Sequence, residues 1–317
     1  MFVLPLLLKA QISLLQNLDI NLSTVEYPYE VRFLKLQFQN HNLQMAYMDV
    51  RPSNPNSKNI LLLHGKNFNG AYWQTTIQEL VNNGFRVIVP DQVGFGKSSK
   101  HFHIQYSFQQ LAWNTRVLLD SLGIEKTAVV GHSMGGMLAT RFALMFPEVT
   151  EKLILENPIG LEDYKVLAPY SPIDAVYKNE LAQTYDKIRQ YQLTYYYDNQ
   201  WKPEYDQWLN LLAGWTLNED YPIIAWNAAL TADMIFTQPV VYEFHLIKSP
   251  TLLIIGTRDR TAIGKALAPP EMQKTMGLYN KLGKKTQQKI PHSQLVGNIK
   301  ANHSTQSIQE PVHAAQP

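Results

Sequence analysis

Hydrophobic and polar residues alternate over two neighbouring stretches near the start of the chain. The alternation covers residues 31–38 and 43–50, and the polar tetrapeptide Gln39-Asn40-His41-Asn42 separates them. A period of two indicates strands with one solvated face, and a short polar connection between such strands indicates an antiparallel hairpin. The sequence therefore predicts a hairpin that begins a mixed sheet.

The pattern then changes to short runs that are apolar throughout. Residues 59–63 and 85–89 are such runs, and a helix is expected between them at 71–83. Strands that crossover helices bury on both faces have this appearance. The alternation continues with helices at 107–122 and 134–146 and with strands at 127–130, 152–156 and 251–255. The predicted fold class is α/β, with a doubly wound and mostly parallel sheet.

Between about residues 159 and 240 this alternation stops, and the sequence becomes helical in tendency and rich in Tyr and Trp. We expect residues 159–240 to form a helical cap and residues 27–158 and 241–317 to form the core. Two interpretations of the cap aromatics stay open: they line a substrate pocket, or they pack in the interior of the cap. They are Tyr195, Tyr196, Tyr197, Trp201, Tyr205, Trp208, Trp215 and Trp226.

Residues 1–26 form a separate N-terminal segment that contains an apolar run at 2–8. The run resembles the apolar part of a secretory signal, but no basic residue precedes it and no clear small-x-small cleavage site follows it. An amphipathic segment that packs on the protein surface would have the same appearance. The sequence leaves the location open between the cytoplasm and export.

Composition narrows the classes of function. The chain has 317 residues, of which 45% are hydrophobic, and this is enough for one large core. Its 28 basic and 26 acidic residues give a formal net charge of +2, so we expect no single-sign field that would attract nucleic acid or an anionic membrane. No stretch approaches the length of a transmembrane helix. The expected partner is a small, largely apolar substrate, and the oligomeric state is open.

The residue types available for catalysis are also limited. The chain has no cysteine, which excludes disulfides, thiolate metal sites and a cysteine nucleophile. The histidines form no H-x-x-x-H pair with accompanying carboxylates, and Gly94-Phe95-Gly96-Lys97-Ser98 lacks the spacing of a phosphate-binding loop. We therefore expect no metal ion and no cofactor.

The most informative motif is Gly131-His132-Ser133-Met134-Gly135, in which a serine lies between two glycines. A short apolar strand precedes the motif, and a helical stretch that ends before Pro147 follows it. In G-x-S-x-G the serine occupies a sharp strand-to-helix turn, and the glycines allow the neighbouring backbone to approach. Ser133 is the predicted nucleophile.

A serine nucleophile needs a histidine base and a carboxylate partner, and in this architecture the chain order is Ser, acid, His. Asp259 lies in the loop that leaves the predicted strand 251–255, so it is the first choice for the acid. Glu156, at the end of the strand after the elbow helix, is the second choice.

Three histidines follow Asp259 in the chain and so satisfy this order. His292 directly follows Pro291, precedes the apolar Leu295-Val296 and looks like the entrance to the last strand, whereas His303 lies beyond that strand. His303 is the predicted base, with His292 and then His313 as alternatives.

Acyl transfer also needs hydrogen-bond donors for the developing oxyanion. The N–H of Met134, after the nucleophile, is one expected donor. The N–H of Lys66, in the loop His64-Gly65-Lys66-Asn67 after the strand 59–63, is the other. His64 lies too early in the chain to be the base, and we interpret it as structural.

These motifs together resemble the α/β-hydrolase superfamily, in particular its capped bacterial serine hydrolases and esterases. The resemblance covers about residues 27–311 and includes Leu62-Leu63-His64-Gly65 and Asp91-Gln92-Val93-Gly94-Phe95-Gly96-Lys97-Ser98, which is similar to the family's D-x-x-G-x-G-x-S turn. It implies an α/β-hydrolase fold with a helical cap. It also implies Ser133, Asp259 and His303 as the triad and the Lys66 and Met134 amides as the oxyanion hole.

The sequence departs from the family near its C-terminus. Family members usually read G-H-x-P, whereas this chain has Asn302-His303-Ser304-Thr305, and little of the usual closing helix follows. The leading hypothesis is a serine esterase for a carboxylic ester with an apolar acyl or aromatic portion. The alternatives are C–C bond hydrolysis of a ring-cleavage diketone or perhydrolase chemistry with the same triad, and a non-catalytic ligand-binding protein that has lost its base.

Overall fold

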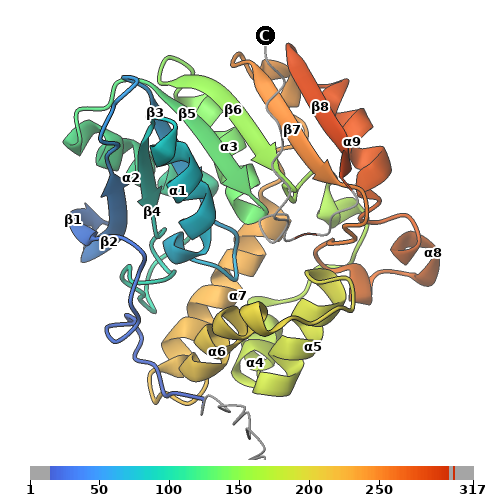
Figure 1. The fold of residues 1–317 in the computed structure, drawn as a ribbon. Helices are drawn as coiled ribbons and strands as arrows, with labels where there is room; N and C mark the ends of the chain where they lie inside the picture. The colour runs from blue at the N-terminus through green and yellow to red at the C-terminus, as the bar shows by residue number, and fades with distance from the viewer. Residues whose placement is uncertain (1–14, 300–302, 304–317) are drawn as a thin grey trace, which may run out of the picture.

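The computed structural model of the chain describes residues 15–299 and 303, in which eight strands form one sheet of order β1-β2-β4-β3-β5-β6-β7-β8 (Figure 1). β1 pairs antiparallel with β2 and β2 with β4, and all later pairs are parallel. The predicted α/β class with a mostly parallel sheet is confirmed. The strands are β1 (Val31–Phe38), β2 (His41–Val50), β3 (Asn59–Leu63), β4 (Arg86–Pro90), β5 (Thr127–His132), β6 (Thr150–Glu156), β7 (Thr251–Gly256) and β8 (Ser293–Ile299).

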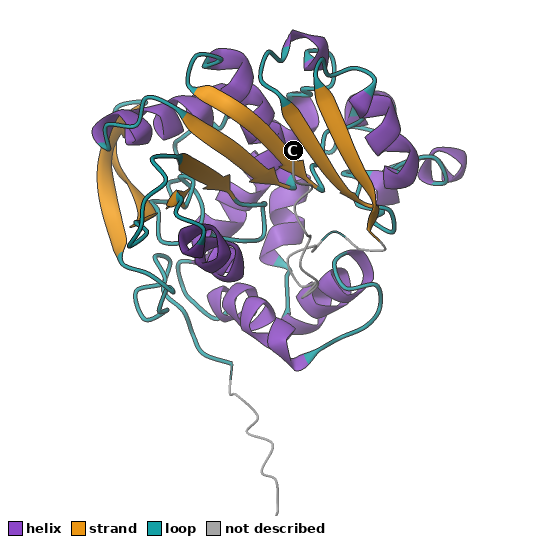
Figure 2. Cartoon of the chain, turned by 45° about the horizontal axis from the view of Figure 1, so that its top comes forward, coloured by secondary structure: helices purple, strands orange, loops and turns teal. Residues whose placement is uncertain are grey.

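Helices cover both faces of the sheet (Figure 2). The α-helices are α1 (Gln74–Asn82), α2 (Phe108–Ser121), α3 (Met134–Met145), α4 (Ile173–Leu181), α5 (Tyr185–Tyr195), α6 (Asp206–Trp215), α7 (Tyr221–Thr237), α8 (Pro270–Gln273) and α9 (Tyr279–Gln287). Short 3₁₀ helices are η1 (Gly70–Trp73), η2 (Tyr164–Val166), η3 (Pro203–Tyr205), η4 (Phe244–Leu246) and η5 (Lys265–Leu267).

The central strand β3 shows why the sheet needs helices on both sides. Its residues alternate between two buried clusters: Leu61 and Leu63 pack with α2 and α3, whereas Ile60 and Leu62 pack with Trp73 and α1. Each fully buried aliphatic side chain contributes about 1.5–3 kcal/mol. The continuous apolar run in the sequence therefore marks a strand that is buried on both faces.

The hairpin forms as predicted, but its turn is shorter. Gln39 and Asn40 have φ of 51° and 62°, and His41 already pairs with Phe38 in the first register position of β2. Positive φ at both central residues characterises the two-residue turn whose twist matches that of the flanking strands. The predicted four-residue connection is wrong because His41 and Asn42 are polar residues of a solvated strand.

A helical insertion lies between β6 and β7, where we predicted the cap. α4 packs against α7 and α5 against α6, and in Figure 1 these helices face the ends of the strands towards which the arrows point. The boundaries at 158/159 and 240/241 stay our proposal for the division between cap and core.

The described part of the N-terminal segment packs against the cap and the core. Leu18 N–H donates to the Gly214 carbonyl at 3.2 Å, and the Trp215 indole donates to the Asp19 carbonyl at 3.0 Å. On the core side, Lys97 Nζ donates to the Leu22 carbonyl at 2.5 Å. The apolar run at 2–8 lies outside the described residues. In the part of the chain that is described, no helix has the length and apolar character needed to cross a membrane.

A buried carboxylate organises the turn after β4. Asp91 Oδ1 accepts from Gly70 N–H at 2.6 Å, and Oδ2 accepts from Lys97 N–H and the Tyr27 hydroxyl, both at 2.7 Å. The Ser98 hydroxyl donates to the Asp91 carbonyl at 2.6 Å. The D-x-x-G-x-G-x-S motif is thus a hydrogen-bonded turn at the edge of the sheet that carries the candidate site.

Asp91→Asn will destabilise the fold more than Tyr27→Phe. The first substitution replaces the carboxylate that accepts three hydrogen bonds by a neutral amide, whose NH₂ group faces other donors. We expect this to lower the free energy of unfolding by about 1.5–3 kcal/mol. The second removes one hydrogen bond, at a cost of about 0.5–1.5 kcal/mol. Urea unfolding at neutral pH measures both free energies. Equal decreases in the free energy of unfolding of the two variants would contradict a central role for the Asp91 carboxylate.

Candidate functional site

Ser133 occupies a strained turn between β5 and α3. Its φ and ψ are 55° and −120°, a conformation that costs a non-glycine residue about 1–3 kcal/mol. A Cβ on Gly131 would collide with the Gly135 carbonyl, and a Cβ on Gly135 would collide with the Leu63 carbonyl. The two glycines therefore allow the close approach of strand and helix that holds the Ser133 side chain at the end of the sheet.

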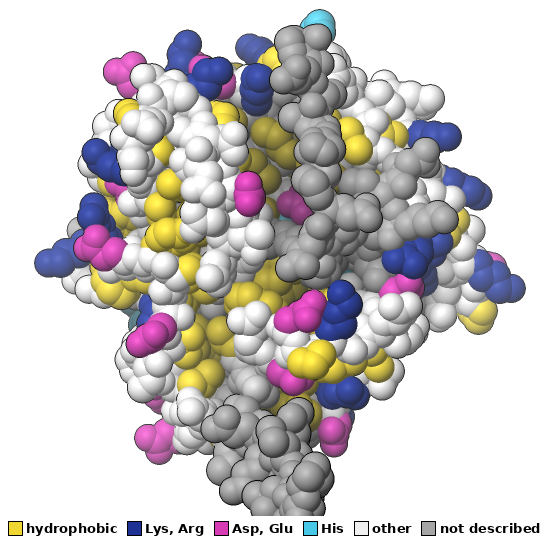
Figure 3. Space-filling view, viewed as in Figure 1, with side chains coloured by type: hydrophobic (Ala, Val, Ile, Leu, Met, Phe, Trp, Pro, Cys, Tyr) yellow, Lys and Arg dark blue, Asp and Glu magenta, His cyan; other side chains and the backbone are white. Residues whose placement is uncertain are grey.

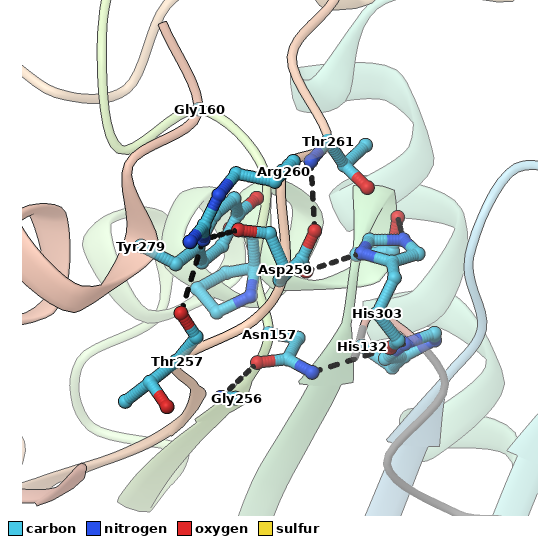
Figure 4. Close-up of polar contacts among 12 residues, drawn as sticks. His132, Asn157, Gly160, Gly256, Thr257, Asp259, Arg260, Thr261, Tyr279 and His303 are labelled. Carbon is cyan, nitrogen blue, oxygen red and sulfur yellow. Dashed lines mark hydrogen bonds and ion pairs between the residues drawn. The ribbon is translucent and has the colours of Figure 1, made fainter. Parts of the chain in front are cut away.

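The structure brings Ser133, His303 and Asp259 into one line of hydrogen bonds. His303 Nε2 lies 2.8 Å from Ser133 Oγ, and His303 Nδ1 lies 2.7 Å from Asp259 Oδ2. Because a carboxylate only accepts, Nδ1 carries the proton and Nε2 is left to accept from the serine hydroxyl. Asp259 Oδ1 accepts from Thr261 N–H at 2.8 Å, which fixes the carboxylate (Figure 4).

This line is shielded from solvent. The exposed fractions are 7% for Ser133 and 1% for both Asp259 and His303. The three residues follow the C-terminal ends of β5, β7 and β8, which are parallel and end at the same edge of the sheet. Burial strengthens the interaction between an imidazolium and the carboxylate beside it, because the local dielectric is low.

Two residues that the sequence analysis did not single out hold the backbone of His303. His132 Nε2 lies 2.8 Å from the His303 carbonyl oxygen, and Asn157 Nδ2 donates to the same oxygen at 3.3 Å. Asn157 Oδ1 accepts from Gly256 N–H at 2.6 Å, so one side chain links the ends of β6 and β7 to His303 (Figure 4). The only local signals were the position of His132 beside the nucleophile and that of Asn157 directly after a strand.

His132 is a neutral donor in this arrangement. Burial, followed by the nearby His303, lowers the pKa of His132 to about 3. Its Nδ1 has no hydrogen-bond partner among the described residues, which agrees with a bare Nδ1 and a proton on Nε2. His132 thus anchors a carbonyl without adding charge next to the base.

His64 has the structural role that we expected. Its Nδ1 lies 2.8 Å from the Gly65 carbonyl, and its Nε2 accepts from Gln92 N–H at 3.1 Å. Burial lowers the pKa of His64. The ring therefore joins the loop after β3 to the turn after β4.

The two predicted oxyanion donors flank the nucleophile. Met134 is the first residue of α3, and Lys66 follows Gly65, where an added Cβ would lie 3.0 Å from Ser133 Cβ. Among residues 15–299 and 303, no acceptor is found for either N–H. Their role as oxyanion donors stays a proposal.

Neither of the two alternative site residues that the structure describes, His292 and Glu156, takes the place of His303 or Asp259. His292 is exposed and precedes β8, and its carbonyl accepts from the N–H of Thr251 at the start of β7, at the opposite edge of the sheet from Ser133. Glu156 offers its backbone carbonyl to Ser133 N–H at 3.3 Å, while the carboxylate beside His303 belongs to Asp259. His313 lies outside the described residues.

Cap aromatics close over the imidazole. The Tyr196 ring stacks on His303 with centroids 5.1 Å apart, and Asn67 Nδ2 donates to the Tyr196 hydroxyl at 2.8 Å. Tyr197 and Tyr205 stack on each other with centroids 3.7 Å apart. These rings form a packed layer, so several of the cap aromatics belong to the interior of the cap. Trp215, in contrast, lines a cavity.

That cavity, of about 390 Å³, lies between core and cap. Lys66 and Asn67 line it from the loop after β3, Gly94 and Phe95 line it from the turn after β4, and Ile263 lines it from the loop after β7. The remaining lining residues lie between positions 180 and 235 of the helical insertion. Most of the α7 and α6 lining is apolar: Leu212, Ile224, Ala225, Ala228, Ala232 and Ile235. Among the described residues, no group of three or more His, Asp or Glu is placed to hold a metal ion.

Charges on the surface are mixed in sign. Figure 3 shows Lys and Arg side chains interspersed with Asp and Glu on the face of Figure 1. This view agrees with the small net charge of +2.

Comparison with known proteins assigns the fold to a family. A family model described as alpha/beta hydrolase fold matches residues 58–306. The chain belongs to this α/β-hydrolase family. The crystal structure of a probable hydrolytic enzyme from Pseudomonas aeruginosa PAO1 is 48% identical, with a TM-score of 0.91, and the match covers 92% of this chain and 94% of that one. This α/β hydrolase is also similar in fold, at 23% identity and a TM-score of 0.61, to a thermophilic esterase from Thermogutta terrifontis, over 86% of this chain and 91% of that one.

A curated relative has a defined substrate. The 2-hydroxy-6-oxononadienedioate/2-hydroxy-6-oxononatrienedioate hydrolase of Comamonas testosteroni is 30% identical over 215 residues, which are 63% of this chain and 71% of that protein. Further hydrolases of 2-hydroxy-6-oxo acids match over shorter stretches, and this α/β hydrolase spans half or less of their length.

The low pKa of His132 predicts a loss of stability in acid. The pKa in the folded state is about 3, whereas an unfolded histidine titrates near pH 6.5. The unfolded state therefore binds the proton first, and this residue lowers the free energy of unfolding as pH falls from about 6.5 towards 3, by up to about 1.4 kcal/mol per pH unit. His132→Gln keeps an N–H donor and does not titrate.

The difference in unfolding free energy between His132→Gln and the wild type should therefore shift in favour of the variant between neutral pH and about pH 4. Urea unfolding of both proteins at several pH values measures this difference. Parallel pH dependences of the two proteins would contradict the prediction.

Proposed function

We propose that the protein is a serine hydrolase that cleaves a carboxylic ester with an apolar acyl or aromatic portion through an acyl-enzyme on Ser133. The observation that carries the proposal is the line of hydrogen bonds from Ser133 through His303 to Asp259. The cavity at the Lys66 loop, whose α6 and α7 lining is mostly apolar, supports the choice of substrate. Membership of the α/β-hydrolase family supports hydrolysis as the reaction class.

In this mechanism Ser133 Oγ attacks the ester carbonyl while His303 Nε2 takes the hydroxyl proton. Asp259 stabilises the imidazolium, and the N–H groups of Lys66 and Met134 donate to the oxyanion. When the tetrahedral intermediate collapses, the proton passes from His303 to the leaving alkoxide and the acyl group stays on Ser133. Water then attacks the acyl-enzyme with His303 again as the base, which releases the acid and restores the serine.

A second candidate is C–C bond hydrolysis of a 2-hydroxy-6-oxo acid. The observation that favours it is the similarity to the Comamonas hydrolase, which extends over 71% of that protein. The same triad serves both reactions. The non-catalytic alternative required the loss of the base, and the position of His303 between Ser133 and Asp259 argues against it.

Ser133→Ala will abolish turnover. We expect wild-type protein to hydrolyse p-nitrophenyl butyrate and to be labelled by a fluorophosphonate, and the variant to lose about 10⁴–10⁶-fold in kcat and all labelling. Spectrophotometric assays and mass spectrometry of the labelled peptide measure both. Equal activity of the two proteins, or wild-type turnover without labelling of Ser133, would refute the assignment. The same assay with 2-hydroxy-6-oxo-6-phenylhexa-2,4-dienoate separates the C–C reaction from the ester reaction.

Asn157→Asp will slow the chemical step more than it weakens substrate binding. The variant retains an acceptor for Gly256 N–H, but it places a carboxylate beside the His303 carbonyl where a donor now lies. We expect kcat to fall about 10–100-fold with little change in KM, because small displacements of a base cost this much. Steady-state kinetics test this, with thermal unfolding as a control for folding. An unchanged kcat would show that this anchor is dispensable.

A further inference from the structure

One side chain of the core–cap cavity has no hydrogen-bond partner. Gln192 on α5 is fully buried and lines the cavity, and neither its Nε2 nor its Oε1 is paired within the described residues. Its backbone carbonyl accepts from the N–H groups of Tyr196 and Tyr197, at 2.8 and 3.1 Å. The end of α5 is therefore fixed while the side-chain amide is left without a partner.

Other polar side chains that line the cavity are already engaged. Lys66 Nζ pairs with Glu180 Oε1 at 3.2 Å, and the Tyr221 hydroxyl donates to the Glu180 carbonyl at 2.8 Å. Gln183 Nε2 donates to the Asn179 carbonyl at 3.4 Å. A buried amide without a partner destabilises a folded protein, and a leucine of similar size in the same place would avoid this. Gln192 is thus the group that a ligand would satisfy.

The chemistry of the side chain defines the ligand. A carboxamide presents a donor and an acceptor side by side, so both are satisfied by a neutral group that presents an acceptor and a donor in the same way. A primary carboxamide or a lactam fits this description. A carboxylate does not, because its oxygens only accept and would face Oε1. Much of the rest of the lining is apolar, with Leu212, Ala228 and Ile235 among its residues.

We propose that the cavity binds the non-reacting part of the substrate as an apolar chain with a primary carboxamide or lactam, and that Gln192 recognises this group. The proposal rests on the proposed ester hydrolysis, because Lys66, whose N–H is the candidate oxyanion donor, lines the same cavity. It changes the expected substrate from a plain hydrocarbon ester to an ester with one neutral polar group at a distance from the scissile bond.

The kinetic test compares matched p-nitrophenyl esters. One series has acyl chains of roughly three to eight carbons, lengths suited to a cavity of this kind, that end in a carboxamide, and the other ends in an isosteric methyl ketone. We expect the wild type to favour the best carboxamide ester by about 10–100-fold in kcat/KM. Gln192→Leu should abolish this preference and raise the melting temperature of the free protein. Gln190→Leu is the matched control, since Gln190 lies exposed on the same helix and donates to Thr194 Oγ1 at 3.0 Å.

Binding provides a second measurement that needs no turnover. Hexanamide should raise the melting temperature of the wild type and of Ser133→Ala more than heptan-2-one does, and Gln192→Leu should lose this difference. Ser133-dependent hydrolysis with the same ester preference in the wild type and Gln192→Leu would overturn the role of Gln192 and leave the hydrolase intact. Absence of any Ser133-dependent hydrolysis would overturn the proposed function. The thermal shifts then decide the binding proposal, and equal shifts in wild type and Gln192→Leu would overturn it.

Discussion

The site depends on a backbone conformation that a serine does not adopt readily. Ser133 has φ of 55°, and the contacts of Gly131 and Gly135 with neighbouring carbonyls keep β5 and α3 close enough to hold it there. Local strain of this kind persists only where the surrounding structure determines it fully. Here the buried parallel sheet fixes both ends of the turn, so the packing of the core also determines where the Ser133 hydroxyl lies relative to His303.

The position of His303 has a different origin. The chain lacks the G-H-x-P sequence usual for the family, and yet the imidazole lies between Ser133 and Asp259. Its carbonyl is held by side chains from the ends of β5 and β6, so the support comes from the sheet. His132 directly precedes the nucleophile in the chain, and its side chain fixes the backbone of the base.

The sequence predicted the order of strands and helices because buried parallel strands and crossover helices leave strong periodic signals. It also predicted which three side chains would meet, since chain order and strand ends restrict the choice. The turn at Gln39-Asn40 was missed because polar residues of a solvated strand resemble a loop. Asn157 and Gln192 were missed for another reason: their roles depend on a carbonyl and a cavity formed by residues distant in the chain, and no local pattern encodes such partners.

The contacts of the N-terminal segment affect the order in which the protein is assembled. The Asp19 carbonyl accepts from the Trp215 indole across 196 positions of the chain. The Leu18 N–H donates to the Gly214 carbonyl over a similar separation. Synthesis proceeds from the N-terminus, so this segment emerges from the ribosome long before α6 exists. Such long-range contacts close late and raise the contact order that slows folding. Leu18 and Asp19 are therefore among the last of the described residues to reach their native contacts.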